Sequence, residues 1–317
     1  MASRTLDELC TVPWTFMGVP YSHNLSDAKA AVLGLPFDCG VHPFRIGSRQ
    51  GPQSIREQSR LMRPYNPELS DFNPMERLGL VDCGDVKVIP SRIVDAFDSI
   101  ESAVRQIMVA GAVPMTMGGD GSVTYPQLRA AASQHRQLAV VHLDSHTDTT
   151  PPRPESEHNA GTQFYRASSE GLIDPASSYH IGLRGTTYLP GGFPRTKELG
   201  YNLITCSELF ARGIPDVLQE LKSALSGRAV YLCVDMDVFD PSCAPGVAAP
   251  SWGGLSAREG IDFLRGLAGL NIVVADVNTV SPPHDQNGMT AFLAAALMYE
   301  IQVLLCRFLH LDTPLSG

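Results

Sequence analysis

The chain has 317 residues, which is long for one domain and short for two, and 44% of them are hydrophobic, enough for a substantial core. Its formal net charge is −9 and its pI is about 5.4. An acidic chain of this kind is a poor partner for nucleic acid or an anionic membrane, so we expect it to bind neither.

The first 30 residues are irregular, and we expect them to form an N-terminal segment over residues 1–30. After it, short apolar runs alternate with helix-like segments, which predicts a single domain over residues 31–317. The runs are continuous rather than alternating, as is typical of strands covered on both faces. Buried strands are predicted at 31–35, 113–117, 138–143, 229–234 and 272–275.

The helical segments can be placed by periodicity and by a capping pattern. Apolar residues at helical spacing predict a helix over 93–110. Ser256 and Glu259 form the S-x-x-E pattern of a capping box, which predicts that another helix begins there. A mostly apolar segment over 291–309 predicts a third, long helix. The alternation predicts an α/β protein with three α-β-α layers and a mainly parallel central sheet.

Three features bear on the compartment. The seven cysteines are scattered and include no CxxC pair, which is typical of reduced thiols. The N-terminus has acidic residues and no apolar core, so we expect no signal peptide. No stretch of 18 apolar residues without a charge was found, so we expect no membrane span. Together these observations predict a cytoplasmic protein.

Metal-ligating side chains follow one of the apolar runs. Residues 140–148 read VVHLDSHTD and place Asp144, His146 and Asp148 at alternate positions. In an extended chain every second side chain points the same way, so all three side chains leave the segment toward one point. His142 lies deeper in the same strand, and we expect a hydrogen-bonded core histidine there.

A second acidic pair, Asp235 and Asp237, follows the run at 229–234. Because ligands bind beyond the carboxyl ends of strands in such sheets, the two segments are expected to converge. Four carboxylates cannot share one site without cations between them, which predicts a divalent-metal centre, in its complete form with two ions. A calcium-like or merely capped loop is the alternative, and the second acidic pair argues against it.

The ligand types narrow the choice of metal. Carboxylate and imidazole ligands without thiolate suit Mn²⁺, and less specifically Ni²⁺, Fe²⁺ or Zn²⁺. Two such ions about 3.5–4 Å apart can share a hydroxide and bring its pKa toward neutrality. Such a hydroxide is a nucleophile for an electrophilic carbon or phosphorus.

A series of motifs resembles the arginase/agmatinase (ureohydrolase) family, and the match runs from about Leu33 to Glu300. In chain order the motifs are LGLPFDCG (33–40), RIGSRQGPQSIR (45–56), DCGDV (82–86), MGGD (117–120), DSHTD (144–148), DMDVFDP (235–241), PG (245–246) and VSPPHD (280–285). The pattern is most similar to the agmatinase, guanidinobutyrase and proclavaminate amidinohydrolase branch. The resemblance implies an arginase-like fold, a dinuclear centre that usually holds Mn²⁺, trimers or hexamers, and hydrolysis of a small guanidino compound to urea and an amine.

Three positions depart from the family pattern, and each falls on a working group. Where the family has Gly-Gly-Asp-His, with the histidine a metal ligand, this chain has Gly121. The family's His-Gly-Thr carries a proton-transferring histidine, and here that position is Ala160. The family's Glu-Val-Ser-Pro carries a carboxylate for the substrate guanidinium, and here that position is Thr279. A neutral hydroxyl cannot replace a charge-assisted contact, so the losses predict impaired catalysis on a retained scaffold.

The resemblance assigns roles to the residues that remain. The predicted metal ligands are Asp144, His146, Asp148, Asp235 and Asp237. Asp144, His146, Asp235 and Asp237 form one fairly complete half-site, and Asp148 lies beside it without the other ligands of a second ion. We expect one divalent ion, Mn²⁺ or Ni²⁺, or none in this chain, rather than two.

The remaining candidate site residues lie in or near the loop after the metal-ligand motif. Asp148 is a candidate for residual orientation of hydroxide, and His158 for substitute proton transfer, with an exposed loop histidine as the alternative for the latter. The predicted substrate contacts are Asn159, Thr162 and Thr279. Arg153, Asn159, Gln163 and Tyr165 are candidates for contact with the substrate's tail.

Three functions are compatible with this pattern. The first is an impaired subunit of a guanidino- or biguanide-compound hydrolase, in a homo- or hetero-hexamer (or trimer) with a catalytic paralogue. The family offers a parallel in heteromeric enzymes resembling metformin hydrolase. The second is an active metal-dependent amidinohydrolase with an altered substrate, and the third a non-catalytic ligand-binding or structural homo-oligomer. Metal analysis and a search for a ligand-complete paralogue would distinguish them.

Overall fold

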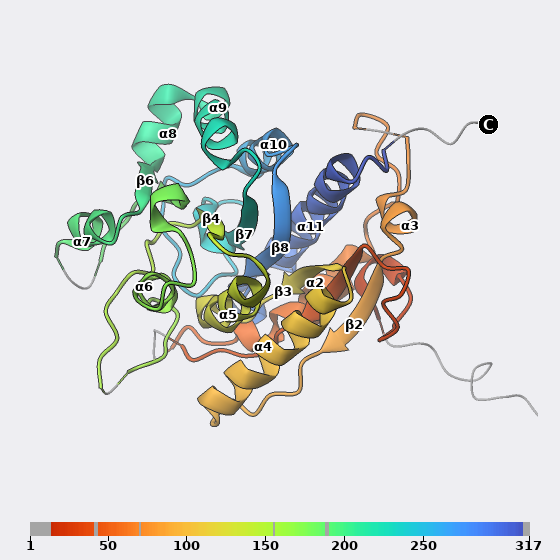
Figure 1. Ribbon diagram of the computed structural model, residues 1–317, viewed down its shortest axis with the longest axis horizontal. Coiled ribbons are helices and arrows are strands. Elements are labelled where there is room, and N and C mark those ends of the chain that lie inside the picture. Colours follow the sequence, from red (N-terminus) through yellow and green to blue (C-terminus); the bar gives the residue numbers. More distant parts are fainter. Residues whose placement is uncertain (1–13, 41–43, 70, 155, 188–189, 313–317) are drawn as a thin grey trace, which may run out of the picture.

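The computed structural model describes residues 14–40, 44–69, 71–154, 156–187 and 190–312, and a single parallel sheet forms its centre (Figure 1). The strand order is β2-β1-β3-β8-β7-β4-β5-β6, and every neighbouring pair is parallel. The strands are β1 Ala30–Gly34, β2 Val81–Asp85, β3 Val113–Met117, β4 Ala139–Leu143, β5 Tyr179–Leu183, β6 Asn202–Thr205, β7 Ala229–Asp235 and β8 Asn271–Asn278.

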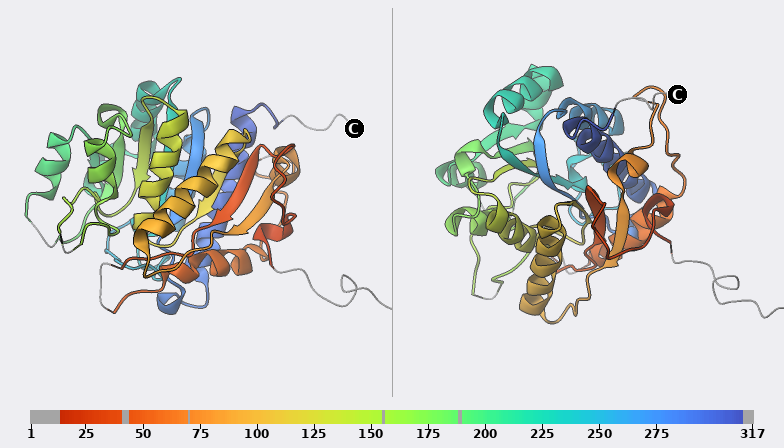
Figure 2. Two further views of the ribbon diagram at one scale, coloured as in Figure 1. Left: turned by 60° about the horizontal axis from the view of Figure 1, so that its bottom comes forward. Right: turned by 45° about the vertical axis from the view of Figure 1, so that its right-hand side comes forward.

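Helices connect these strands and cover both faces of the sheet (Figure 2). The α-helices are α2 Gly51–Ser59, α3 Pro74–Leu78, α4 Ile93–Val109, α5 Thr124–Gln134, α6 Gln163–Ser169, α7 Gly192–Glu198, α8 Cys206–Arg212, α9 Ile214–Leu225, α10 Ala257–Gly266 and α11 Met289–Phe308. Short 3₁₀ turns lie at η1 Phe16–Gly18, η2 Ser48–Gln50, η3 Gly121–Val123, η4 Pro175–Ser177, η5 Met236–Val238 and η6 Pro282–His284.

Alternate side chains of each strand enter opposite layers, because successive residues of a strand point to opposite faces. In β1, Ala30 and Val32 join the apolar layer formed with α2, α3, α9, α10 and α11, whereas Ala31 and Leu33 pack with α4 and α5. A further cluster packs α5 and α6 on the same side as α4, around β4 and β7. This arrangement confirms the predicted three-layer α/β fold, with a sheet that is entirely parallel in the described residues.

The five predicted strands correspond to β1, β3, β4, β7 and β8. Three strands were not predicted, namely β2, β5 and β6. Their sequences VDCGD, YHIGL and NLIT contain polar residues or glycine and lack a long apolar run. The capping box is confirmed, because the Ser256 hydroxyl accepts from the Glu259 amide at 3.3 Å while the Ser256 amide donates to Glu259 Oε2 at 2.8 Å.

The predicted irregular segment over residues 1–30 is described only from residue 14 onward. There Phe16, in η1, is fully buried, and its backbone amide donates to Asp82 Oδ2 of β2 at 2.9 Å. This part of the segment therefore packs against the sheet edge. A domain boundary at residue 30 stays a prediction.

Helix α11 is long and apolar enough to cross a membrane by length and composition alone. In the fold, 83% of its apolar window is buried, and it packs against α2, α3, α10 and β8. Its buried Glu300 receives two hydrogen bonds from Arg265, at 2.8 and 3.0 Å. Helix α11 is therefore a core helix that forms much of one outer layer.

Candidate metal centre

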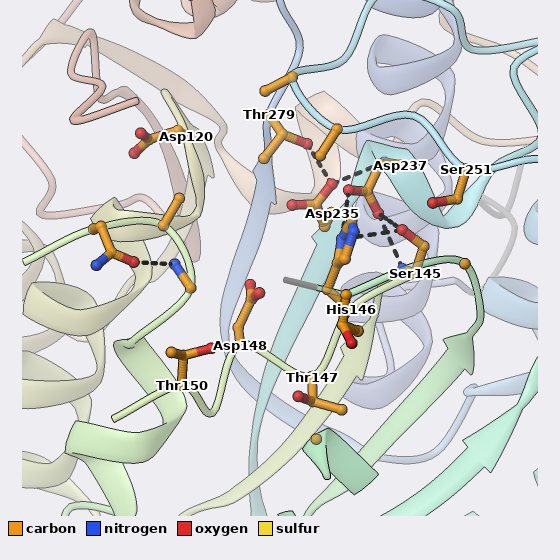
Figure 3. A pocket seen from close by; sticks show the side chains of 18 of the residues that line it. Asp120, Ser145, His146, Thr147, Asp148, Thr150, Asp235, Asp237, Ser251 and Thr279 are labelled. Carbon is orange, nitrogen blue, oxygen red and sulfur yellow. Dashed lines mark hydrogen bonds and ion pairs between the residues drawn. The ribbon is translucent and has the colours of Figure 1, made fainter. Parts of the chain in front are cut away.

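The two acidic segments meet because the strands that precede them are neighbours in the sheet. Strands β4 and β7 pair in register, with Leu143 opposite Val234, so Asp144 and Asp235 follow side by side. Strand β8 pairs with the other edge of β7, with Asp235 opposite Asn278, which brings Thr279 to the same place. Figure 3 shows Asp235, Asp237 and Thr279 gathered with His146 at this edge of the sheet.

Three of the side chains form a compact trio. The ligand atoms of Asp144, His146 and Asp237 lie within 4.8 Å of one another. His146 Nδ1 is 3.2 Å from Asp144 Oδ1 and 3.0 Å from Asp237 Oδ2. The other oxygen of Asp237 accepts from the backbone amide and the hydroxyl of Ser145, at 3.0 and 2.8 Å. These bonds fix Asp237 with one oxygen facing His146.

Asp235 completes this side of the cluster. One of its oxygens accepts from the Asp237 amide at 2.8 Å and from the Thr279 hydroxyl. Thr279 therefore binds a carboxylate of the cluster rather than projecting a free group into the cavity. It does so from a left-handed backbone conformation, with φ of 67°, which is costly for a β-branched residue.

The trio fits a single divalent cation. Asp144 Oδ2 is buried and faces His142 Nε2 at 2.9 Å, while Oδ1 faces His146 Nδ1. Among the ion pairs of the described residues, none joins Asp144 to a lysine or arginine, so its buried charge is left for a cation to balance. Carboxylate oxygens beside an imidazole suit Mn²⁺ or Ni²⁺. Asp144, His146 and Asp237 would hold the ion, and Asp235 borders it.

The electrostatics of the cluster also call for a cation. Burial, followed by the charge of Asp237, raises the pKa of Asp144 to about 7. Burial and neighbouring carboxylates likewise raise the pKa of Asp235 and of Asp148 well above the usual range. Burial alone would lower the pKa of His146, but Asp237 and Asp144 outweigh it and hold that pKa well above 6.5. Without a metal, several of these groups retain protons that a cation would displace.

Burial alone would raise the pKa of Asp237, but His146 holds that pKa below the usual range.

His142 lies in β4, two residues before Asp144, and is buried. Its Nδ1 lies 2.8 Å from His180 Nδ1, which agrees with a hydrogen-bonded core histidine. Burial lowers the pKa of His142 to about 4, so the ring is neutral. Its ligand atoms also lie within 4.8 Å of those of Asp144 and Asp148.

In Figure 3 Asp148 lies apart from His146 and Asp237, although its ligand atom is within 4.8 Å of that of Asp144. Its Oδ2 accepts a hydrogen bond from the side-chain amide of Gln163, at the start of α6. Gly121, in η3, contributes no side chain, and a Cβ built there would lie 2.8 Å from Gln163 Nε2. The only candidate ligands grouped with Asp148 in the described residues are Asp144 and His142, and His142 is bonded to His180 in the core, so this side offers a poorer fit to an ion than the trio. The role of Gln163 was not foreseen, because only the fold brings α6 against η3.

A cavity of about 890 Å³ opens over the cluster. Its lining includes His146, Asp148, Asp235, Asp237 and Thr279 together with Asn159 and Ala160 of the loop after the ligand motif. Four arginines also line it, namely Arg45, Arg153, Arg184 and Arg195. Three of them are engaged by the protein itself, since Arg45, Arg184 and Arg195 donate to backbone carbonyls.

The other predicted loop residues take different positions. Asn159 lines the cavity, but its side chain bonds to the loop, accepting from the Gly161 amide at 2.8 Å and donating to the Ser156 hydroxyl at 2.9 Å. Thr162 is buried and donates to the Asn159 carbonyl at 3.1 Å, outside the cavity lining. Neither bond involves the acid cluster, so their roles toward a substrate stay predictions.

His158 is not brought to the acid cluster. Its ring lies between Phe97 and Tyr125, with centroid distances of 5.1 and 6.2 Å, and it is absent from the cavity lining. It is half-buried, so the expectation of an exposed loop histidine is not met either. Burial, followed by the charge of Arg166, lowers the pKa of His158. Its aromatic surroundings orient it away from proton transfer at the carboxylates.

The comparisons with known proteins agree with this fold and site. Residues 28–303 match the arginase family. The chain is 36% identical to guanidinopropionase of Pseudomonas aeruginosa over 92% of its own length and 91% of that protein. It is 38% identical to an agmatinase of an Enterobacter species over 87% of each. Proclavaminate amidino hydrolase of Streptomyces clavuligerus superposes with a TM-score of 0.89 at 35% identity, covering 94% of this chain and 98% of that one.

A parallel sheet with an acid cluster at the carboxyl ends of its central strands is the architecture of a ureohydrolase. The chain belongs to the arginase family, in its agmatinase-like branch.

Proposed function

We propose that this chain is a subunit of a cytoplasmic guanidino- or biguanide-compound hydrolase and that its own metal centre is impaired. It would hold one divalent ion, Mn²⁺ or Ni²⁺, at Asp144, His146 and Asp237. It would assemble with a catalytic paralogue into a hexamer or trimer. The proposal is supported above all by the asymmetry of the cluster. Asp144, His146 and Asp237 form one group of ligands, whereas Asp148 is bonded to Gln163 and shares its group with His142, a buried histidine that is bonded to His180.

The catalytic groups that remain in the cavity limit the reaction that this chain can support. A bound ion would supply Lewis acidity and a more acidic bound water. Ala160 at the cavity wall offers no proton carrier, and loss of such a group typically lowers a rate by about 10²–10⁴-fold. Asp148 remains as an acceptor in the cavity and is a candidate to orient a water molecule.

Recognition of a cationic substrate is weakened in the same way. Position 279 is a threonine, so it offers no carboxylate to pair with a guanidinium. The Thr279 hydroxyl also donates its hydrogen bond to Asp235. Asn159 and Thr279 can offer only neutral contacts to a small guanidino compound in the cavity. Both deficits are expected to be met by the corresponding residues of a paralogue.

The test is metal analysis and guanidine hydrolysis by the purified chain, alone and co-expressed with a ligand-complete ureohydrolase from the same genome. We expect at most one equivalent of metal and negligible urea release from the chain alone, and a mixed oligomer with full activity. In the mixed oligomer, Asp235→Ala in this chain should leave turnover largely intact, whereas the same change in the paralogue should abolish it.

The opposite result would favour an active hydrolase with an altered substrate. That function predicts two bound ions and brisk hydrolysis by the isolated chain, both abolished by Asp235→Ala. Specific ligand binding by a homo-oligomer without turnover, with or without the paralogue, would instead favour a binding or structural role.

A further inference from the structure

Gln163 occupies an unusual position for a buried amide. Its side chain is 2% exposed and points into the space between Asp148 and Gly121. Its nitrogen donates to Asp148 Oδ2, while its oxygen, Oε1, is buried without a hydrogen-bond partner among the described residues. An unpaired buried polar atom costs about 1–3 kcal/mol, and a hydrogen bond to a charged group is worth a similar amount. Within the described part of the chain, the bond to Asp148 is the one side-chain contact of Gln163 that offsets this cost.

The space that Gln163 fills is where a ligand from η3 would stand. A Cβ added to Gly121 would lie 2.8 Å from Gln163 Nε2, 3.1 Å from the Ala160 carbonyl and 3.5 Å from Asp148 Oδ2. A side chain at position 121 would thus point toward Asp148 and collide with the Gln163 amide first. Contacts under 3.0 Å are essentially never made by real Cβ atoms, so the end of the Gln163 side chain would have to move, and its hydrogen bond to Asp148 would be disturbed.

The backbone holds Asp148 and Gln163 together independently of this side-chain bond. The Phe164 amide donates to the Asp148 carbonyl at 3.1 Å, which ties the start of α6 to the ligand loop. Asp148 itself adopts a left-handed conformation, with φ of 51°. Its carboxylate is therefore fixed beside position 163, and whatever side chain stands there must satisfy it.

We infer that the Gln163 amide stands in for a second cation beside Asp148 and physically closes that half of the centre. The inference rests on the proposed function, because it explains why only one half-site remains. It goes further in stating that the chain excludes the second ion by a residue it contains, and not merely by ligands it lacks. A histidine restored at position 121 would then be insufficient by itself.

Four variants test the inference, with metal content after Mn²⁺ loading and thermal unfolding with and without Mn²⁺ as readouts. Gln163→Glu keeps the shape but places a second carboxylate beside Asp148. We expect a lower unfolding temperature without metal, restoration by Mn²⁺, and one additional equivalent of bound Mn²⁺. Gln127→Glu is the matched control, since Gln127 is equally buried but bonds only to the neutral Thr116 and Val123. It should be destabilised without restoration by Mn²⁺.

The second arm restores a ligand. Gly121→His alone should gain no ion, whereas Gly121→His with Gln163→Ala should gain one equivalent of Mn²⁺. If Gly121→His alone fails to fold and the double variant folds, the collision with Gln163 is supported directly. An additional ion in Gly121→His with Gln163 intact would overturn the inference. An equal response of Gln163→Glu and Gln127→Glu to Mn²⁺ would overturn it as well.

These outcomes are separable from those of the proposed function. Guanidine hydrolysis by the wild-type chain carrying one ion would overturn the proposed function and leave the Gln163 inference standing. A second ion in Gly121→His alone, in a chain that stays inactive without a paralogue, would overturn only the inference. Two ions in the wild-type chain would overturn both.

Discussion

Two groups of buried carboxylates in this protein differ in where their countercharge comes from. At the β2 edge, Asp82 receives both Nε and Nη2 of Arg56, at 2.8 and 2.9 Å, while Nη1 of the same arginine contacts Asp85 at 2.6 Å. Beyond β4 and β7, the carboxylates of Asp144, Asp148, Asp235 and Asp237 lie near two histidines, His142 and His146. Among the ion pairs of the described residues, none joins these four to a lysine or arginine.

The source of the countercharge distinguishes a structural carboxylate, Asp82, from the carboxylates of a candidate ligand-binding site. Asp82 is fully buried yet satisfied, since it also accepts from the Phe16 and Gly84 amides at 2.9 Å each. A bidentate guanidinium stays in place whatever the solution contains. The central cluster lacks such a group, so its charge must be met by protons or by metal from outside. Stability at one site is therefore independent of added cations, and at the other it is not.

The largest effect is expected from breaking the buried ion pair between Arg56 and Asp82. Arg56→Met should lower the free energy of unfolding by about 3–5 kcal/mol, because it leaves Asp82 buried and unpaired. Urea denaturation measures this, and added Mn²⁺ should not restore it. Arg258→Met, at an exposed pair with Asp262, is the control and should change little. A loss for Arg56→Met no larger than the control would contradict the comparison.

An intermediate effect is expected from neutralising the central cluster. Asp144→Asn removes a crowded buried charge, so the metal-free protein at pH 7 should be no less stable than wild type. The stabilisation by Mn²⁺, about 2.7 kcal/mol at a concentration 100 times the Kd, should disappear. Thermal unfolding with and without Mn²⁺ tests both points. Asp82→Asn should show the reverse pattern, with lower stability in both conditions.

A pH dependence sharpens the same contrast, and it is the smallest effect when taken over a single pH unit. The pKa of Asp144 is about 7 in the fold against an ordinary value of 3.8, so the fold favours the protonated acid. Its contribution to stability should therefore fall as pH rises from about 4 to about 7, by up to about 1.4 kcal/mol per pH unit.

Mn²⁺ requires the deprotonated acid, so its affinity should rise over the same range by about tenfold per proton released per pH unit. Urea denaturation at several pH values with and without Mn²⁺ measures both slopes. Equal slopes in the two conditions would show that the cluster does not bind the ion through Asp144.

Much of the fold could be predicted because buried parallel strands are continuous apolar runs. The runs at β4 and β7 gave their positions nearly to the residue. Strand β2 could not be found in this way, because its sequence VDCGD is polar. Its Asp82 can be buried in the fold because Arg56 of α2 pairs with it. A tertiary ion pair of this kind leaves no local pattern in the sequence.

The site was predictable to a similar depth. The expected convergence of the segments after β4 and β7 brings Asp144, His146 and Asp237 together. The expected alternation does not extend to Asp148, because its left-handed backbone ends the extended run. The placement of His158 depended on a loop whose course is set by contacts with Phe97 and Tyr125, more than 30 residues earlier in the chain. Gln163 was considered only as a contact for the substrate's tail, because nothing local connects α6 with position 121.

The burial of helix α11 has a consequence for how the chain is made. The eight strands of the described sheet end at residue 278, but the helix that covers much of one of its faces spans Met289–Phe308 and leaves the ribosome after all of them. Until then a broad apolar surface is open to other nascent chains, the situation in which aggregation competes with folding. A premature stop upstream of residue 289 would make this exposure permanent, and we expect such fragments to be insoluble or chaperone-bound.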